Sequence, residues 1–144
     1  MHRQISDAPP GTGFAHTIRV YYDDTDAGGV VYHASYLRFM ERARTEWLRA
    51  HGFDHTRLAQ DLGVLFIVRA LSIKYQRPAI LDDVLRVRVD PGRAGRGLIQ
   101  FRQSVERGAA VLARADVSVA CIDIESMKAV PLPVALQTIF GGAA

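Results

Sequence analysis

The first regular pattern in this chain of 144 residues is an alternation of apolar and polar positions over residues 16–22. Ile18, Val20 and Tyr22 fall on one face of that stretch, which is the spacing of a half-buried strand. We therefore predict that residues 16–22 form a strand, with these three side chains on its apolar face.

A helical period replaces the alternation from about Ser35 onward. The apolar positions follow the spacing of one buried helix face, and they are Tyr36, Phe39, Met40, Ala43 and Trp47. The polar positions on the opposite face are Arg38, Arg42, Thr45 and Arg49. The pattern predicts one long helix, and Gly52 is expected to end it as the C′ residue.

Four further stretches are typical of strands, and they span residues 64–76, 84–90, 98–106 and 109–124. Turns are expected between them at residues 78–83, at the glycine-rich residues 91–97 and at residues 107–108. Residues 64–68 are apolar at every position, which predicts burial on both faces or contact with another subunit. Residues 53–63 are expected to be a connector with a short helical turn near residues 56–61.

One strand, one long helix and four strands joined by short connections predict an α+β protein with a five-stranded antiparallel sheet. The length suits one domain. Residues 1–13 are expected to be a mobile N-terminal segment, residues 14–134 the folded domain, and residues 135–144 a C-terminal tail. Because one helix cannot cover both faces of such a sheet, the uncovered face and the edges predict an oligomer.

Composition restricts the class of protein further. Hydrophobic residues make up 49% of the chain and charged residues 23%, as in globular proteins. The net charge of +3 fits an anionic small ligand, and the arginines are too dispersed to predict a nucleic-acid partner. The single cysteine, Cys121, agrees with a reducing compartment, so a cytoplasmic location is expected. Neither a signal peptide nor a transmembrane helix is expected.

The junction between the first strand and the helix gathers groups that could carry out chemistry. Its acidic residues, glycines and histidine are Asp23, Asp24, Asp26, Gly28, Gly29 and His33. The paired glycines permit unusual backbone angles and allow a ligand to come close. The free N–H groups at the start of the helix favour negative charge. A carboxylate there could attack a carbonyl or activate water, while an N–H group stabilises the oxyanion.

Residues 21–48 closely resemble the acyl-CoA thioesterases of the YbgC type, within the 4-hydroxybenzoyl-CoA thioesterase family. The matching stretch reads YYDDTDAGGVVYHASYLRFMERARTEWL, with the pattern Asp-x-x-Gly-x-Val-Tyr-His. The resemblance extends over roughly residues 15–133. It implies a hotdog fold, in which an antiparallel sheet wraps around one long helix. It also implies dimers that pair edge strands, often assembled into homotetramers, with the active site at the subunit interface.

The resemblance also implies roles for individual residues. Asp26 matches the catalytic carboxylate of the family, and His33 and Tyr22 match residues counted in its active site. The N–H group of His33 is implied as the oxyanion donor, because it opens the helix. The substrate-binding residues are expected to be Gly28, Gly29, Val30 and Tyr32.

Each catalytic candidate also has a structural interpretation. From its position alone, Asp26 is as well explained as a turn residue or a partner of the helix dipole. His33 could simply begin the helix, and Tyr22 could pack on the apolar face of the first strand. Asp23 and Asp24 are expected to cap the backbone, to pair with arginine or to face water.

Other candidate groups are given structural roles. No metal is expected, because Gly52 interrupts the helix between His51 and His55. Cys121 lies on an apolar strand face and is predicted to be part of the core.

Two helix glutamates, Glu41 and Glu46, also deserve comparison, since a related hotdog group uses a helix glutamate as its carboxylate. Here Asp26 fills that need. The arginines that could pair with the two glutamates are Arg42, Arg44 and Arg49.

The implied activity is hydrolysis of a small or medium acyl-CoA, with no cofactor, since coenzyme A is part of the substrate. Asp26 would act as nucleophile or general base, and the basic candidates for the coenzyme A phosphates are Lys74, Arg77, Arg93, Arg96 and Arg102. Acyl carrier protein is a possible further partner, and YbgC-type enzymes are associated with the Tol–Pal envelope system. The alternatives are a non-catalytic acyl-CoA-binding or Tol–Pal scaffold protein, and a dehydratase acting on acyl carrier protein.

Overall fold

The computed structural model describes residues 13–140. In chain order the strands and helices are β1 (Phe14–Arg19), α1 (Ser35–Ala50), α2 (His55–Arg57), β2 (Val64–Tyr75), β3 (Val84–Gly95), β4 (Leu98–Arg107), β5 (Ala110–Asp123) and α3 (Val134–Gln137). A 3₁₀ turn lies between β1 and α1, and a π-helical turn follows α2. The mobile segment predicted for residues 1–13 lies outside the described residues, except for Gly13.

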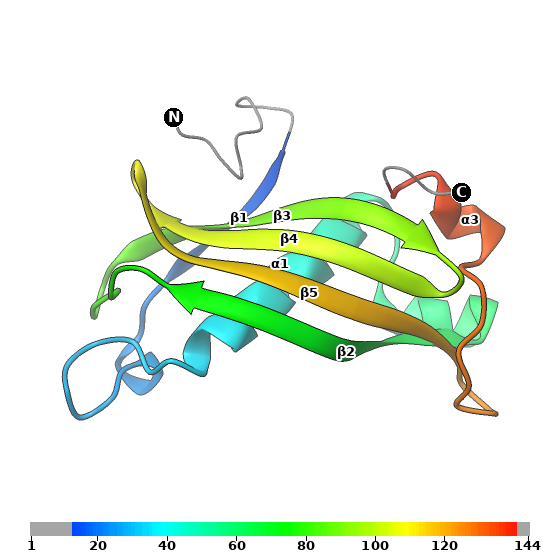
Figure 1. Cartoon of the computed structure of the whole chain (residues 1–144), viewed down its shortest axis with the longest axis horizontal. Coiled ribbons are helices and arrows are strands. Elements are labelled where there is room, and N and C mark those ends of the chain that lie inside the picture. Colours follow the sequence, from blue (N-terminus) through cyan, green and yellow to red (C-terminus); the bar gives the residue numbers. More distant parts are fainter. Residues whose placement is uncertain (1–12, 141–144) are drawn as a thin grey trace.

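The five strands form one antiparallel sheet, as the sequence predicted, and their order is β1-β3-β4-β5-β2. Figure 1 shows α1 running obliquely across one face of this curved sheet. β2 and β3 are consecutive and antiparallel in direction, but they do not pair. Short connections usually join neighbouring strands, which is the basis of the antiparallel prediction, and that inference was wrong for this pair. Residues 76–83 instead lead from one side of the sheet to the other.

The core lies between α1 and the sheet. All five apolar positions predicted for the helix are buried, and they are Tyr36, Phe39, Met40, Ala43 and Trp47. The helix ends as predicted, because Gly52 has a φ of 90° and donates its N–H to the carbonyl of Arg49. Burial of one large apolar side chain stabilises a fold by about 1.5–3 kcal/mol, so this face holds α1 on the sheet.

The first strand is shorter than its sequence pattern predicted. β1 ends at Arg19, and Tyr22 begins the 3₁₀ turn Tyr22–Asp24. Tyr22 is 82% exposed, so its expected packing beside Ile18 and Val20 was wrong. The physical reason is that the backbone folds back here, with Asp24 and Thr25 donating their N–H groups to carbonyls three residues earlier.

Two further boundaries differ from expectation. β3 continues through the glycine-rich residues predicted as a turn, with a register shift between Pro91 and Ala94. α3 was not expected, and Leu136 and Phe140 are buried in the main core. The folded unit therefore extends beyond residue 134, and residues 141–144 of the expected tail lie outside the described range.

β2 is a long edge strand with much of its apolar surface exposed. Val68 is 45% exposed and Leu71 is 41% exposed, and both are large apolar residues. Residues 64–68 are thus not buried on both faces within one chain. Contact with another subunit, the other interpretation of this apolar run, stays a prediction. No helix among residues 13–140 is long and apolar enough to cross a membrane.

Candidate active site

Asp24 is the structural centre of the loop between β1 and α1. Its buried carboxylate accepts the N–H of Tyr21 at 2.8 Å and pairs with the guanidinium of Arg38 at 3.1 Å. Its carbonyl accepts the N–H of Tyr32 at 2.9 Å and the hydroxyl of Ser35 at 3.1 Å. These bonds fasten both ends of the loop to the start of α1 and confirm the capping and pairing roles expected for Asp24.

Asp26 lies at the tip of the same loop and is exposed. The backbone closes around it through the N–H of Asp26 to the carbonyl of Val30, at 2.9 Å, and the N–H of Gly29 to the carbonyl of Asp26, at 3.0 Å. The N–H of Gly28 donates to Oδ1 of Asp26 at 2.8 Å. Gly29 has a φ of 83°, which a residue with a side chain rarely adopts. The turn therefore holds the carboxylate in place and leaves Oδ2 with no hydrogen bond from residues 13–140.

A second segment, residues 75–80, holds the loop from the other side. The N–H of Val31 donates to the carbonyl of Ala79 at 2.9 Å, and Val30 pairs with Ile80 in an isolated β-bridge. The N–H of Ala79 donates in turn to the hydroxyl of Tyr36 on α1, at 3.1 Å. Burial raises the pKa of Tyr36 above its ordinary value, so this hydroxyl stays protonated.

The N-terminus of α1 presents two N–H groups that make no hydrogen bond within the described part of the chain. Within residues 13–140 no acceptor faces the N–H of His33 or the N–H of Ala34. The carbonyl of His33, by contrast, accepts the hydroxyl of Tyr75 at 2.8 Å. Free N–H groups at a helix start favour negative charge, so the site can stabilise an oxyanion.

Asp26 and His33 open into one cavity of about 340 Å³. Its lining residues are Asp26, Val30, Val31, His33, Tyr36, Tyr75, Gln76, Arg77 and Pro78. Three of the candidates named from the sequence, Asp26, His33 and Val30, are thus brought together. The other four, Tyr22, Gly28, Gly29 and Tyr32, do not line this cavity in the single chain, and their binding or catalytic roles stay predictions.

The cavity also contains residues that the sequence argument did not select. Tyr75, Gln76 and Pro78 come from the end of β2 and the connection after it. Tyr36 was assigned only to the helix core. Arg77 was one of several basic candidates. The spacing of residues in the sequence could not show that Arg77 lines the same cavity as Asp26.

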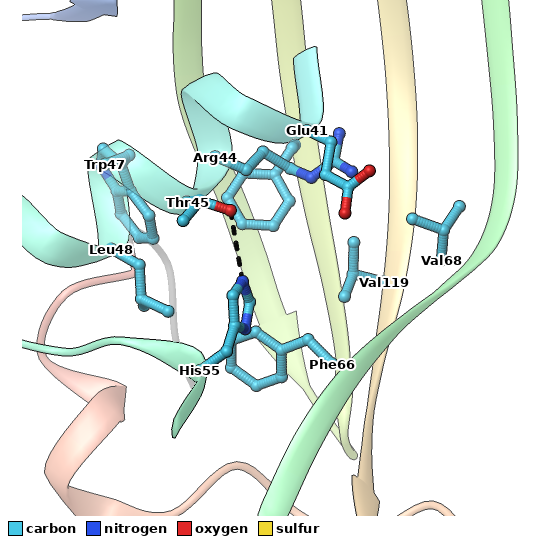
Figure 2. A pocket seen from close by; sticks show the side chains of 10 residues that line it. Glu41, Arg44, Thr45, Trp47, Leu48, His55, Phe66, Val68 and Val119 are labelled. Atoms are coloured by element: carbon cyan, nitrogen blue, oxygen red, sulfur yellow. Dashed lines mark hydrogen bonds between the residues drawn. The ribbon is translucent and has the colours of Figure 1, made fainter. Parts of the chain in front are cut away.

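A second cavity of about 180 Å³ lies between α1 and the strands of the sheet (Figure 2). Apolar side chains from α1, β2, β4 and β5 form most of its wall, namely Trp47, Leu48, Phe66, Val68, Phe101 and Val119. Its polar residues are Glu41, Arg44, Thr45 and His55, and Thr45 Oγ1 lies 3.3 Å from Nε2 of His55. Such a pocket suits an apolar group with a polar attachment.

Arg44 in this second cavity is held by a buried amide. Its Nη1 donates to Oε1 of Gln103 at 2.8 Å, and Nε2 of Gln103 donates to the carbonyl of Met40 at 3.1 Å. Burial lowers the pKa of the Arg44 guanidinium, although nearby Glu41 opposes that effect. Among residues 13–140 Arg44 forms no ion pair with a glutamate, unlike the expectation, whereas Arg49 pairs with Glu46.

The structure also describes the surroundings of Cys121 and of the possible metal-binding side chains. Cys121 is fully buried, and burial raises the pKa of its thiol to about 11, which confirms it as a core residue. Among residues 13–140 no group of three or more metal-binding side chains comes together.

Comparison with known proteins shows similarity to thioesterases. The Thioesterase-like superfamily matches residues 20–140 of the chain. The acyl-CoA thioesterase YbgC of Haemophilus influenzae is 44% identical over 128 residues, which cover 89% of this chain and 94% of that protein. The acyl-CoA thioester hydrolase YbgC of Escherichia coli O6:H1 is 43% identical, with coverages of 90% and 96%.

Solved structures show the same fold. A probable thioesterase from Bartonella henselae has a TM-score of 0.80 and 38% identity, covering 84% of this chain and 99% of that one. The 1,4-dihydroxy-2-naphthoyl-CoA thioesterase Slr0204 from Synechocystis has a TM-score of 0.81 and 26% identity, with coverages of 88% and 94%. The fold is therefore the hotdog fold of these enzymes, and the chain belongs to the Thioesterase-like superfamily and, within it, to the YbgC family.

Proposed function

We propose that this protein hydrolyses the thioester of a small or medium acyl-CoA to the free acid and coenzyme A. The observation that carries the proposal is the cavity that Asp26 shares with His33, whose N–H has no acceptor among residues 13–140. A thioester has a reactive carbonyl and a good leaving group. One carboxylate and one oxyanion site are therefore sufficient for its hydrolysis.

Asp26 takes one of two roles in the reaction. As a nucleophile, its carboxylate adds to the carbonyl carbon, the C–S bond breaks to release coenzyme A thiolate, and water then hydrolyses the mixed anhydride. As a general base, it removes a proton from a water molecule that attacks the same carbon. In both routes the N–H of His33 and the helix dipole stabilise the oxygen that becomes negative.

The cavity of Figure 2 is our candidate for the acyl group. It lies beside the third turn of α1, about 15 Å along the helix from its start, since each residue rises 1.5 Å. Two copies paired antiparallel through β2 would bring the Tyr75 end of one strand opposite the Val64 end of the other. Asp26 of one subunit would then act on an acyl group bound in the apolar pocket of the other subunit, as in the interface site that the family resemblance implies.

This arrangement requires a homo-oligomer, which we propose to be a dimer or a homotetramer built as a dimer of dimers. Among the basic candidates, Arg77 lines the Asp26 cavity and is our choice for a coenzyme A phosphate. A cytoplasmic location, a partnership with acyl carrier protein and a link to the Tol–Pal system stay predictions.

Thiol release from a panel of acyl-CoAs, compared between the wild type and Asp26→Asn, tests the proposal. A general base contributes about 10²–10⁴-fold, so we expect a loss of that size with folding and assembly unchanged. Activity that survives in Asp26→Asn would move the carboxylate role to Glu41 or Glu46. Repeated turnover in oxygen-18 water separates the two routes, because only direct attack places label in the Asp26 carboxylate.

The alternatives give different results in the same panel. A non-catalytic binding or scaffold protein would bind acyl-CoA tightly without releasing thiol. A dehydratase would hydrate an enoyl thioester, although the proline-rich motif expected for that group is missing from residues 1–144.

A further inference from the structure

We propose that Tyr75 is a positioning residue for the oxyanion site, and that it acts through the carbonyl of His33. This inference rests on the proposed function, because it assigns a residue to the same site. Tyr75 is the last residue of β2, and its hydroxyl donates to the His33 carbonyl at 2.8 Å, across 42 positions of the chain. It is the point where the exposed edge strand contacts the start of α1.

The hydrogen bond fixes one peptide group at the start of the helix. A trans peptide is planar, and its C=O and N–H groups point in opposite directions. By holding the C=O of His33, the Tyr75 hydroxyl therefore also fixes the direction of the N–H of Ala34. This N–H and the preceding N–H of His33 both lack a hydrogen-bond acceptor among residues 13–140. The direction of the Ala34 N–H, which lies next to the His33 N–H in the chain, thus depends on the hydroxyl of a residue far away in the sequence.

The surroundings of Tyr75 keep its hydroxyl in place as a donor. Its ring packs edge-on against Tyr36, with centroids 5.3 Å apart, and against His33, at 6.5 Å. Burial and the neighbouring Tyr36 raise the pKa of Tyr75 above its ordinary value of 10.0. The hydroxyl is therefore protonated at neutral pH and can donate its hydrogen bond to the His33 carbonyl.

Tyr75→Phe tests the role because it keeps the ring and removes only the donor. A misdirected oxyanion donor stabilises the transition state less for every substrate, so we expect kcat to fall about 3- to 10-fold. We expect KM to stay within about twofold and the loss to be equal for acetyl-, butyryl-, hexanoyl- and benzoyl-CoA. Tyr21→Phe is the matched control, since Tyr21 is exposed and its hydroxyl makes no side-chain hydrogen bond with another residue of 13–140.

Rates are expressed per folded protein, as measured by circular dichroism. An unchanged kcat, a loss confined to KM, or a loss that varies with acyl group would overturn the positioning role. If those results appear while Asp26→Asn is inactive, only this inference fails and the proposed function stands.

A second measurement is independent of activity. Hydrogen exchange of the backbone amides in residues 30–37, followed by mass spectrometry, should accelerate about threefold or more in Tyr75→Phe and not in Tyr21→Phe. Equal exchange in the wild type and Tyr75→Phe would contradict the anchoring contact, even if the wild type released no thiol from any substrate.

Discussion

The carboxylate of Asp26 lies against a glycine at which a Cβ atom would make a tight contact. A Cβ atom at Gly28 would lie 3.2 Å from Oδ1 of Asp26, and no other atom would be so near. Gly28 does not have a positive φ, so alanine can adopt its backbone conformation. We therefore expect Gly28→Ala to displace the carboxylate and to lower kcat about tenfold or more, with unfolding changed little. Gly95→Ala is the control, because a Cβ there meets nothing within 4 Å. Equal kcat values for the two variants would contradict this prediction.

Cys121 should be unreactive in the folded protein. Its thiol is buried and its pKa is raised to about 11, so little thiolate forms at pH 8. We expect a thiol reagent such as DTNB to label the native protein at least about 100-fold more slowly than the urea-unfolded protein. Rapid labelling of the native form would show that this part of β5 opens readily.

At the scale of elements, the connection after β2 supports the active-site loop through Asp83. The side chain of Asp83 accepts the N–H of Ile80 at 2.9 Å and the guanidinium of Arg107 at 2.7 Å. Burial acts to raise the pKa of Asp83, but these two bonds outweigh it and hold the pKa below its ordinary value of 3.8. We expect Asp83→Asn to reduce the free energy of unfolding by about 1–2 kcal/mol at pH 7.

The difference in the free energy of unfolding between the wild type and Asp83→Asn should depend on pH with a definite sign. Because the pKa of Asp83 is lower in the folded than in the unfolded chain, its contribution is complete above about pH 4. It is lost as the pH falls through the folded-state pKa. The free energies of unfolding of the wild type and Asp83→Asn, measured in urea, should therefore become equal as the pH falls. Asp82→Asn changes an exposed neighbour, and its free energy of unfolding should match that of the wild type at every pH. A difference that grows at low pH would contradict the assignment.

At the scale of the whole molecule, the exposed side of β2 should control assembly. Leu71 is a large apolar residue on an edge strand and is 41% exposed. We expect the wild type to sediment as a multiple of its 15.9 kDa chain, and Leu71→Lys to shift it toward monomer, because a charge would be buried at the contact. Ser72→Lys, at the adjacent position, which points to the opposite face of the sheet, should have the smaller effect. A monomeric wild type would contradict the interface.

Periodicity predicted the helix and all five strands because their buried faces repeat regularly. It failed at Tyr22, where hydrogen bonds of the loop outweigh an alternation that continues by chance. It also missed Gln103, a polar residue that is fully buried because Arg44 and the Met40 carbonyl satisfy its amide. The motif located Asp26 and His33, whereas Tyr75 and Arg77 join them only through the path of the β2–β3 connection, which no local pattern encodes.

The two edges of the sheet differ in length, and this difference limits how far copies of the chain can add to one another. β2 offers twelve residues for pairing, and β1 at the other edge has six. If β2 joins β2 around a twofold axis, both long edges are used, and the joined sheet ends at a short strand on each side. Growth then stops at a closed pair along the sheet direction, whereas pairing of β2 with β1 would propagate into a fibre. In such a pair, the unequal edges would protect the chain geometrically against open-ended polymerisation.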